Sequence, residues 1–270
     1  MTIRWGVRIV RCEGCSLVFA SPQPTQGELE SYYGPEYFHK NAEKFLRFPM
    51  QRDVELRLTR YLDELRAVCP TGRVLDVGCG TGLFPWLCGE AGFSATGVEL
   101  SPYASELGRE RLGVDIRTGR LEEMDAIQRF DAITMWDFLE HTTDPVDILR
   151  RAHALLEDGG HLLMTVPNVG SWWARCMGAR WVGFDKASEH LFYFTHKSLG
   201  RMLERAGFTP LSVRAHSWIC TTSFVTERGA KAWPFGGGLL QKTVQRFELS
   251  ERVVRFPSVN LIAVARKIPG

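Results

Sequence analysis

Hydrophobic positions along the chain change their spacing several times, and each change marks an expected element. Between residues 41 and 68 apolar side chains recur every three or four positions, which predicts an amphipathic helix. Further along, short apolar runs alternate with helical patterns. The expected strands cover residues 73–78, 94–100, 114–119, 130–136 and 161–168, and the expected helices cover 83–90, 101–113 and 144–160. Strands that alternate with helices favour a parallel sheet with helices on both faces.

The last part of the chain departs from this alternation. Residues 169–195 are rich in aromatic side chains, residues 195–208 fit an amphipathic helix, and two further strands are expected at 209–215 and 259–267. We interpret these two strands as the far edge of the same sheet. The predicted fold is therefore α/β, a doubly wound sheet with a helical and aromatic cap. The expected domain covers residues 41–270, with cap insertions at 169–195 and 217–257.

A glycine-rich stretch, VLDVGCGTGLF at residues 74–84, coincides with the end of the first strand pattern. Gly78, Gly80 and Gly82 permit a tight turn and let ligand atoms approach the backbone. The following helix offers free N–H groups at its start. Glu99 ends the second expected strand, where a carboxylate can accept hydrogen bonds from both hydroxyls of a ribose. These features predict a nucleoside cofactor, and a glycine turn that serves only packing is the plainer alternative.

The glycine spacing is G-x-G-x-G, preceded by Asp76, and differs from the G-x-G-x-x-G of dinucleotide-binding proteins. Together with GVELSP, FDAITMWDFLEH, LLEDGGHLLMTVPN and HLFYFTHKSLGRMLERAGF, in this order, it resembles the class I S-adenosylmethionine-dependent methyltransferases. The resemblance covers roughly residues 70–215. It implies a Rossmann-like sheet of seven strands, mostly parallel with the last strand antiparallel, and S-adenosylmethionine as the cofactor.

The same resemblance implies contacts to the cofactor. Asp76 would approach its ammonium group, Glu99 would hold the ribose, and Leu100 would lie against the adenine. Arg120 stands where many members carry an acid, so backbone groups would have to accept from the adenine amino group. Trp136 would place an aromatic face beside the sulfonium, with core packing as the equal alternative. The full set implied to bind the cofactor is Asp76, Gly78, Cys79, Gly80, Gly82, Glu99, Leu100, Leu121 and Trp136.

Two histidine-containing stretches compete for the role of the base that takes a proton from the acceptor. His190, with Glu189 before it, resembles the Glu-His pair of sugar C-methyltransferases, in which the His is a candidate base and the Glu assists it. His141 lies in the other stretch, WDFLEH. We prefer His190 over His141, and a core histidine is the plainer alternative for His190.

In WDFLEH, Asp137, Glu140 and His141 would share one face of a helical turn. The stretch resembles the ubiquinone-type O-methyltransferases, in which an acid–acid–His set has been associated with a divalent metal. Asp137 and Glu140 also fit a capping pair at a helix start. We assign no metal ligand from the sequence.

Residues 1–40 carry half of a zinc-binding pattern. The stretch with Cys12 and Cys15 resembles the second half of a zinc ribbon found on some sugar-type methyltransferases. Because structural zinc needs four ligands and one C-x-x-C pair is present, we expect no intact zinc site within one chain. An ion shared by two chains is the alternative. Tyr33 and Tyr37 are candidate walls of the cofactor pocket, with packing under a loop as the alternative.

Composition narrows the function classes. The 270 residues are 44% hydrophobic and 24% charged, and a net charge of +2 favours neither nucleic acid nor a membrane surface as partner. No apolar run approaches the ~20 residues of a membrane span, and the N-terminal residues lack a signal-peptide pattern. Seven cysteines, an odd number, fit a reducing cytoplasm.

We therefore expect an enzyme that methylates oxygen or carbon of a small-molecule acceptor by in-line displacement, with a His base. One alternative is a protein that binds S-adenosylmethionine without turnover. Another is a methyltransferase that acts on protein or nucleic acid, which would need a basic groove or an aromatic platform. A nicotinamide-dependent enzyme is disfavoured by the glycine spacing.

Overall fold

A computed structural model describes residues 2–4, 6–25, 27–28, 52–125, 127–223, 225–226, 246 and 252–268 of the chain. The strands of its larger sheet are β4 (Arg73–Val77), β5 (Ser94–Glu99), β6 (Asp115–Thr118), β7 (Phe130–Trp136), β8 (Leu156–Pro167), β10 (Phe208–Thr221) and β11 (Val253–Lys267). Its helices are α3 (Arg52–Val68), α4 (Leu83–Glu90), α5 (Pro102–Leu112), α6 (Pro145–Leu155), α7 (Trp172–Met177) and α8 (His196–Arg205). The short 3₁₀ helices are η1 (Leu121–Glu123), η2 (Leu139–His141), η3 (Gly178–Arg180) and η4 (Val182–Lys186).

The seven-stranded sheet has the order β10-β11-β8-β7-β4-β5-β6. The strands β4 to β8 run parallel, whereas β11 runs antiparallel to both β8 and β10. The predicted doubly wound α/β fold is confirmed, including the two final strands at the far edge. The strand order reverses at β4, and ligands of such sheets bind beyond the carboxyl ends of the strands at this switch point.

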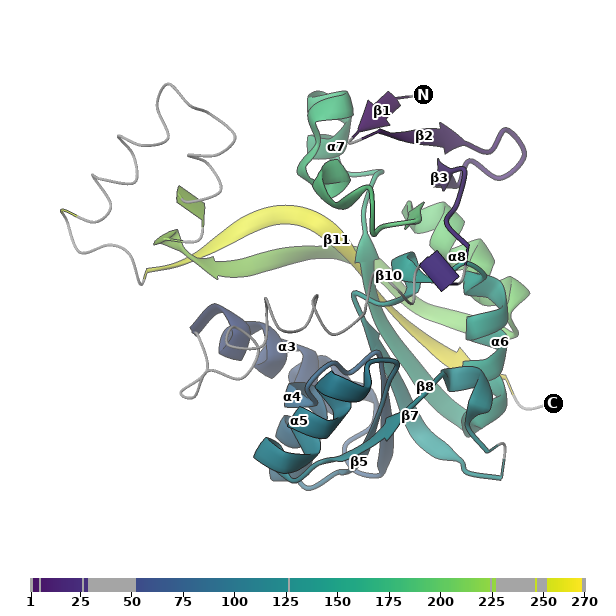
Figure 1. Cartoon of the computed structure of the whole chain (residues 1–270), viewed down its shortest axis with the longest axis vertical. Helices are drawn as coiled ribbons and strands as arrows, with labels where there is room; N and C mark the ends of the chain where they lie inside the picture. The colour runs from purple at the N-terminus through teal and green to yellow at the C-terminus, as the bar shows by residue number, and fades with distance from the viewer. Residues whose placement is uncertain are drawn as a thin grey trace.

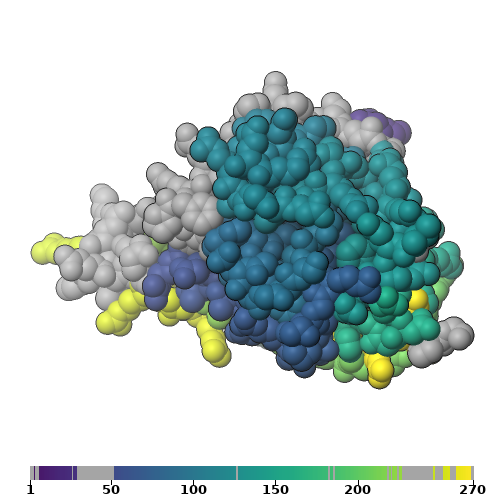
Figure 2. Space-filling view, turned by 90° about the horizontal axis from the view of Figure 1, so that it is seen from below, coloured from purple at the N-terminus to yellow at the C-terminus, as the bar shows by residue number. Residues whose placement is uncertain are grey.

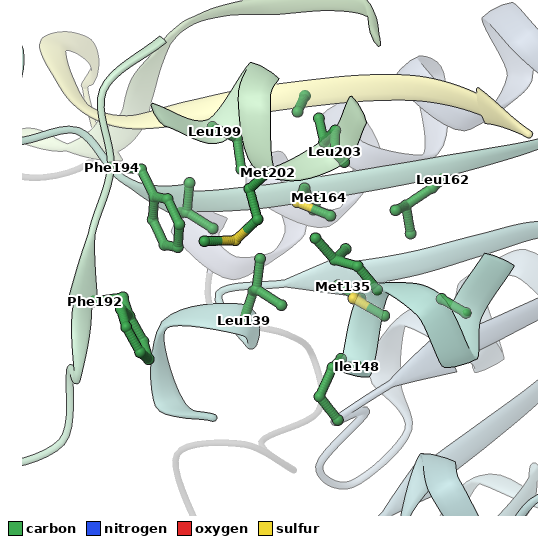
Figure 3. Packing of buried hydrophobic residues seen from close by; sticks show 14 of the residues in the cluster. Met135, Leu139, Ile148, Leu162, Met164, Phe192, Phe194, Leu199, Met202 and Leu203 are labelled. Carbon is green, nitrogen blue, oxygen red and sulfur yellow. The ribbon is translucent and has the colours of Figure 1, made fainter. Parts of the chain in front are cut away.

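Helices cover both faces of this sheet (Figure 1). On one face the apolar side of α3 packs with α4 and with Leu163 of β8. On the other face α8 and α6 cover β7 and β8, and Figure 3 shows Met202 of α8 near Met135 and Met164 in this layer. Burying such side chains contributes about 1.5–3 kcal/mol each. In the space-filling view the blue part of the chain packs directly against the teal and green part (Figure 2).

Capping residues set the starts of two helices as expected. The side chain of Ser101 accepts from the amide of Ala104 at the start of α5, and Asp144 accepts from the amide of Asp147 at the start of α6. The end of α6 differs from the expected stop at residue 160, because the helix ends at Leu155. Leu156 already pairs with Phe130, and the four residues after it form an irregularity in the β7–β8 ladder. The strand pairing therefore overrides the helical pattern there.

The N-terminal residues form a second sheet that the pattern of short turn-rich pieces did not predict. Its strands are β1 (Thr2–Arg4), β2 (Val7–Arg11), β3 (Val18–Ser21) and β9 (Phe192–Tyr193), in this order. Since β3 pairs with β9, the N-terminal strands join the aromatic segment 169–195. Cys12 and Cys15 lie between β2 and β3, and neither is in a disulfide. Tyr33 and Tyr37 lie outside the described residues.

The strands β10 and β11 are longer than expected and continue as a two-stranded ribbon beyond β8 (Figure 1). Thr221 pairs with Val253, so both ends of the expected insertion 217–257 belong to strands. Most of the residues between them lie outside the described part of the chain. None of the helices in the described residues has the length and apolar character that a membrane crossing requires.

Candidate active site

The glycine loop connects β4 to α4 at the switch point of the sheet. Gly78, Gly80 and Gly82 have φ angles of 70°, 57° and 78°, which lie in the left-handed region of backbone conformation. Residues that have a Cβ rarely adopt this region. The amide of Gly78 donates to the carbonyl of Val98 on β5 at 2.9 Å, which ties the loop to the neighbouring strand. The loop is thus a folded, hydrogen-bonded turn.

The three glycines of the loop lack a side chain for two different reasons. A Cβ on Gly78 would lie 2.4 Å from the ring of Phe138, and a Cβ on Gly82 would lie 2.7 Å from Ile116. A Cβ on Gly80 would meet nothing within 4 Å. Gly78 and Gly82 therefore permit close packing, while the Gly80 backbone borders open space. This open face is the feature of the loop that suits the approach of a cofactor.

The side chain of Cys79 points away from that open face. Its Sγ lies against Gly97 of β5, where an added Cβ would come within 2.4 Å of the sulfur. Burial raises the pKa of the Cys79 thiol well above its ordinary value. A buried neutral thiol packs as a small apolar group.

Glu99 connects the end of β5 to the glycine loop. Its Oε2 accepts from the amide of Gly80 at 2.9 Å, and its Oε1 accepts from the amide of Ser101 at 2.9 Å. The side chain is buried, and burial raises its pKa while the backbone amides oppose that rise. Each carboxylate oxygen has a second lone pair, so Glu99 can still accept hydrogen bonds from a pair of hydroxyls.

Asp76 lies beneath the loop as a buried carboxyl group. Its Oδ1 accepts from the hydroxyl of Thr134 at 2.6 Å. Burial raises the pKa of Asp76 to about 7, and the Thr134 hydrogen bond works against that rise. A buried carboxyl with a raised pKa is a ready partner for a cationic group, because the cation stabilises the ionised form.

The three remaining residues predicted to contact the cofactor differ in burial and in their neighbours. Leu100 is half-buried between β5 and α5, whereas Leu121 is buried in the core. Trp136 stacks on Tyr61 with ring centroids 4.1 Å apart and meets Phe84 edge-on at 5.4 Å. Its indole Nε1 is buried without a hydrogen-bond partner. The cofactor contacts of these three residues stay predictions.

Asp137 does not share a helical face with Glu140 and His141, which corrects the sequence-based expectation. Its φ angle is 51°, in the left-handed region, so the turn η2 begins only after it. Its Oδ1 accepts from Thr165 at 2.9 Å and from Asn260 at 2.8 Å. These two strand residues were missed, because only the pairing of β11 with β8 brings Asn260 to this edge.

The two histidine-containing stretches that compete in the sequence meet in one cluster. The rings of His141 and His190 lie 4.8 Å apart between centroids, at an angle of 83°. One donor atom each of Glu140, His141 and His190 lies within 4.8 Å of the other two. Backbone contacts hold the stretches together, since the amide of Leu191 donates to the Glu140 carbonyl at 2.7 Å.

Burial shifts every titratable group of this cluster toward its neutral form. It raises the pKa of Glu140 well above the ordinary value, and the charge of Asp137 raises it further. It lowers the pKa of His141 to about 3, with a further contribution from Lys186. The pKa of His190 is lowered well below its ordinary value by burial and by His141. Both imidazoles are therefore neutral at pH 7 and carry a lone pair.

Glu189 contributes to the cluster through its backbone. Nδ1 of His141 lies 3.1 Å from the Glu189 carbonyl oxygen, to which it donates in the matching tautomer. The Glu189 carboxylate forms an ion pair with Lys186 at 3.7 Å. Glu189 thus orients His141, whereas its side chain faces the lysine.

A comparison with protein families matches residues 50–213 to the family described as "Methyltransferase domain". The match covers more than half of the chain. The chain belongs to this methyltransferase family. Its sheet order and glycine loop are those of the class I S-adenosylmethionine-dependent methyltransferases, as the sequence predicted.

Curated relatives and solved structures agree with this assignment. The methyltransferase is 36% identical over 110 residues to a ubiquinone biosynthesis O-methyltransferase of Xanthomonas campestris; the match covers 38% of this chain and 46% of the relative. The chain thus spans about half the length of the curated relatives that it matches. It shares its fold with the 1,6-didemethyltoxoflavin-N1-methyltransferase of Burkholderia thailandensis, with a TM-score of 0.58, 19% identity, and coverage of 96% and 99% of the two chains. It also shares the fold of the magnesium protoporphyrin IX methyltransferase of Synechocystis PCC 6803, with a TM-score of 0.59, 12% identity, and coverage of 90% and 100%.

The residues of this methyltransferase fit S-adenosylmethionine as its cofactor. The Gly80 backbone borders open space, and the buried Glu99 carboxylate beside it suits the ribose hydroxyls. Asp76, buried and ready to ionise beside a cation, suits the ammonium of the methionine arm. The fit rests on an open backbone face between two buried acids.

Proposed function

We propose that this methyltransferase methylates oxygen or carbon of a small-molecule acceptor, with His190 as the base. The observation that carries the proposal is the contact of Phe138 with Gly78. It joins the glycine loop to the turn η2, which carries Glu140 and His141 and adjoins His190. The cofactor loop and a set of neutral imidazoles are therefore neighbours at one edge of the sheet.

Three residues of the chain would hold the cofactor. Glu99 holds the ribose, Asp76 in its ionised form pairs with the ammonium group, and the Gly80 backbone borders the methionine arm. When bound, the cofactor supplies an electrophilic methyl group on a sulfonium. Alignment of acceptor and methyl group contributes up to about 7–11 kcal/mol in well-oriented cases, and most of the catalysis is expected from this alignment.

His190 would take the proton that leaves an acceptor hydroxyl or an activated carbon. Its Nδ1 is buried and has no hydrogen-bond partner, and the backbone of Gly183 hydrogen-bonds to the ring. A neutral imidazole with an unoccupied lone pair can accept a proton, and a general base typically contributes about 10²–10⁴-fold. The burial that lowers the pKa of His190 keeps it neutral but weakens it as a base. His141, held by the Glu189 carbonyl, is the second candidate and otherwise a positioning residue for His190.

The cap supports an acceptor of small size. Trp181, Phe184 and Tyr193 are buried and pack edge-on against one another, within the hydrophobic core that also contains residues of β7 and β8. The proteins named above include a ubiquinone biosynthesis O-methyltransferase and a 1,6-didemethyltoxoflavin-N1-methyltransferase, whose names refer to small molecules. We carry the same acceptor class to this chain as a proposal. A cytoplasmic location and the lack of a nucleic-acid or membrane partner stay predictions.

The test combines binding with transfer. Calorimetry should show binding of S-adenosylhomocysteine, and incubation with tritiated S-adenosylmethionine should label one member of a panel of quinol precursors, small phenols and nucleotide sugars. His190→Gln should lower kcat by about 10²–10⁴-fold, while His161→Gln, on β8 outside the cluster, should not. Binding without labelling of any acceptor would indicate a protein without turnover, and labelling of only protein or nucleic acid would contradict a small-molecule acceptor.

A further inference from the structure

Several of the buried polar atoms without hydrogen-bond partners in the described chain lie close to one another, between η2 and β9. Glu140 Oε2, His190 Nδ1 and Tyr193 OH are all in this state, and they come from η2 and from the segment that ends in β9. Such atoms are rare in proteins, because a buried polar group that lacks a partner destabilises the fold. A group of them therefore points to a ligand.

We propose that Glu140, His141 and His190 bind one divalent transition-metal ion through one carboxylate oxygen and two imidazole nitrogens. This donor set suits a zinc-like ion, because imidazole favours the later transition metals, whereas Mg²⁺ and Ca²⁺ prefer oxygen. The site goes beyond the proposed methyl transfer, which does not itself require a metal. It also differs from the acid–acid–His set that the sequence suggested, since His190 takes the place of Asp137.

Backbone hydrogen bonds orient the imidazole rings of His141 and His190 for metal binding. His141 donates from Nδ1 to the Glu189 carbonyl, which directs its lone pair onto Nε2. The Gly183 backbone holds the ring of His190, and the Nδ1 of this ring has no partner. Histidine ligands of metals almost always have one ring nitrogen held by a carbonyl or carboxylate in this way. The outer contacts of a metal site are therefore already present.

The distances between the three donor atoms and the charges around them fit a metal ion once the side chains move slightly closer together. The three donor atoms lie within 4.8 Å of one another, and a tetrahedral ion with bonds of about 2.0–2.1 Å holds its ligand atoms about 3.3 Å apart. Rotation of the side chains supplies this difference. Lys186, whose positive charge faces the two histidines, pairs with Glu189 at 3.7 Å, which reduces its repulsion of the ion.

The ion and the proposed base compete for the same lone pair. A His190 nitrogen that binds the metal cannot accept a proton, so the metal-free and loaded proteins differ in how they activate an acceptor. In the loaded protein an acceptor hydroxyl would fill a remaining coordination position and lose its proton more readily. Metal binding itself depends neither on cofactor nor on acceptor, so it is measured without them.

The experiment uses the full chain with Cys12 and Cys15 replaced by Ser, because these two thiols, half-buried and exposed respectively, are competing metal ligands. After dialysis against a chelator, the protein is titrated with Zn²⁺ by calorimetry and with Co²⁺ by visible absorption. The variants are Glu140→Gln, which keeps the side-chain shape, His141→Gln and His190→Gln. His161→Gln is the matched control outside the cluster. Thermal unfolding and S-adenosylhomocysteine affinity are measured on every sample.

We expect one equivalent of Zn²⁺ to bind, with a Co²⁺ spectrum typical of nitrogen and oxygen donors. Each of the three variants should weaken binding by more than about 100-fold, beyond the loss that outer contacts cause, and His161→Gln should leave it unchanged. No binding, or equal binding by Glu140→Gln and the parent protein, would overturn the site. Cofactor affinity without metal affinity would overturn this inference alone, and the reverse result would overturn the proposed function alone.

Discussion

The amide of Gly80 donates a hydrogen bond of 2.9 Å to Oε2 of Glu99. This bond joins the turn after β4 to the end of β5, so the two parts of the expected cofactor site are held as one unit. The other oxygen of Glu99 fixes the amide of Ser101, the N-cap of α5. A change at Glu99 should therefore affect cofactor binding and the fold together.

Replacement of Glu99 by Ala should lower the affinity for S-adenosylhomocysteine by about 10- to 100-fold, since hydrogen bonds to a charged group contribute about 1.5–3 kcal/mol. It should also destabilise the protein, because the amides of Gly80 and Ser101 lose their buried acceptor. Calorimetry and thermal unfolding measure the two effects. Glu122→Gln, an exposed acid in η1, is the control. An unchanged affinity in Glu99→Ala would remove Glu99 from the cofactor site.

The open face of Gly80 predicts that binding and stability can be separated. Gly80→Ala adds a methyl group into open space, so its only folding cost is the positive φ, about 1–2 kcal/mol. The same methyl group should obstruct the cofactor and weaken its binding by more than about tenfold. Gly113→Ala is a matched control, because Gly113 has a φ of 67° and also meets nothing within 4 Å. It should lose similar stability and no affinity.

The raised pKa of Asp76 predicts a pH-dependent cofactor affinity. In the free protein Asp76 keeps its proton up to about pH 7, and pairing with the ammonium group requires the ionised form. Affinity should therefore rise about tenfold per pH unit below 7 and level off above it. Titrations in buffers of different ionisation enthalpy should show release of one proton below pH 7. In Asp76→Asn both effects should vanish, and a pH-independent wild-type affinity would contradict the assignment.

The raised pKa of Asp76 also makes the free energy of unfolding depend on pH. The folded protein binds the Asp76 proton more tightly than the unfolded chain, whose Asp groups titrate near about 3.9. The contribution of Asp76 to the free energy of unfolding is therefore largest below pH 4 and is lost as the pH rises from about 4 to about 7. Comparison with Asp76→Asn by denaturant unfolding at several pH values isolates this contribution.

The sequence predicted the main sheet well, because its signals are local. Ser101 and Asp144 cap helices where their side chains were expected to, and the glycine loop follows its strand directly. The second sheet was not foreseen, since β9 has only two residues and pairs with β3, far away along the chain. Short strands with a distant partner leave little periodicity to detect.

The sequence identified individual residues of the candidate site but not how they are grouped in space. His141 and His190 were each identified by local motifs, yet they looked like alternatives because 49 positions separate them in the numbering. The contact between η2 and β9, which no periodic pattern predicts, makes them one cluster. Asp137 was misplaced because its left-handed φ interrupts the helical spacing that the motif suggested.

The strained backbone of Asp137 predicts that the residues that hold it also position the turn η2. A non-glycine residue at positive φ costs about 1–2 kcal/mol and persists only where its surroundings hold it. Here Thr165 and Asn260 hold it, and Phe138, the next residue, packs against Gly78. Asn260→Ala should release Asp137, shift η2 and move the histidine cluster relative to the loop.

The expected result for Asn260→Ala is a fall in kcat of about tenfold or more, since small misplacements in an active site can cost about 10²-fold. The affinity for S-adenosylhomocysteine should change by less than about twofold, because Glu99 and Asp76 keep their own contacts. Thr96→Val removes an exposed side-chain hydrogen bond, from Thr96 to Asp115 at 3.0 Å, outside the site and should leave kcat unchanged. Equal losses of kcat in the two variants would show that Asn260 acts only through general stability, and an unaltered kcat in Asn260→Ala would separate Asp137 from catalysis altogether.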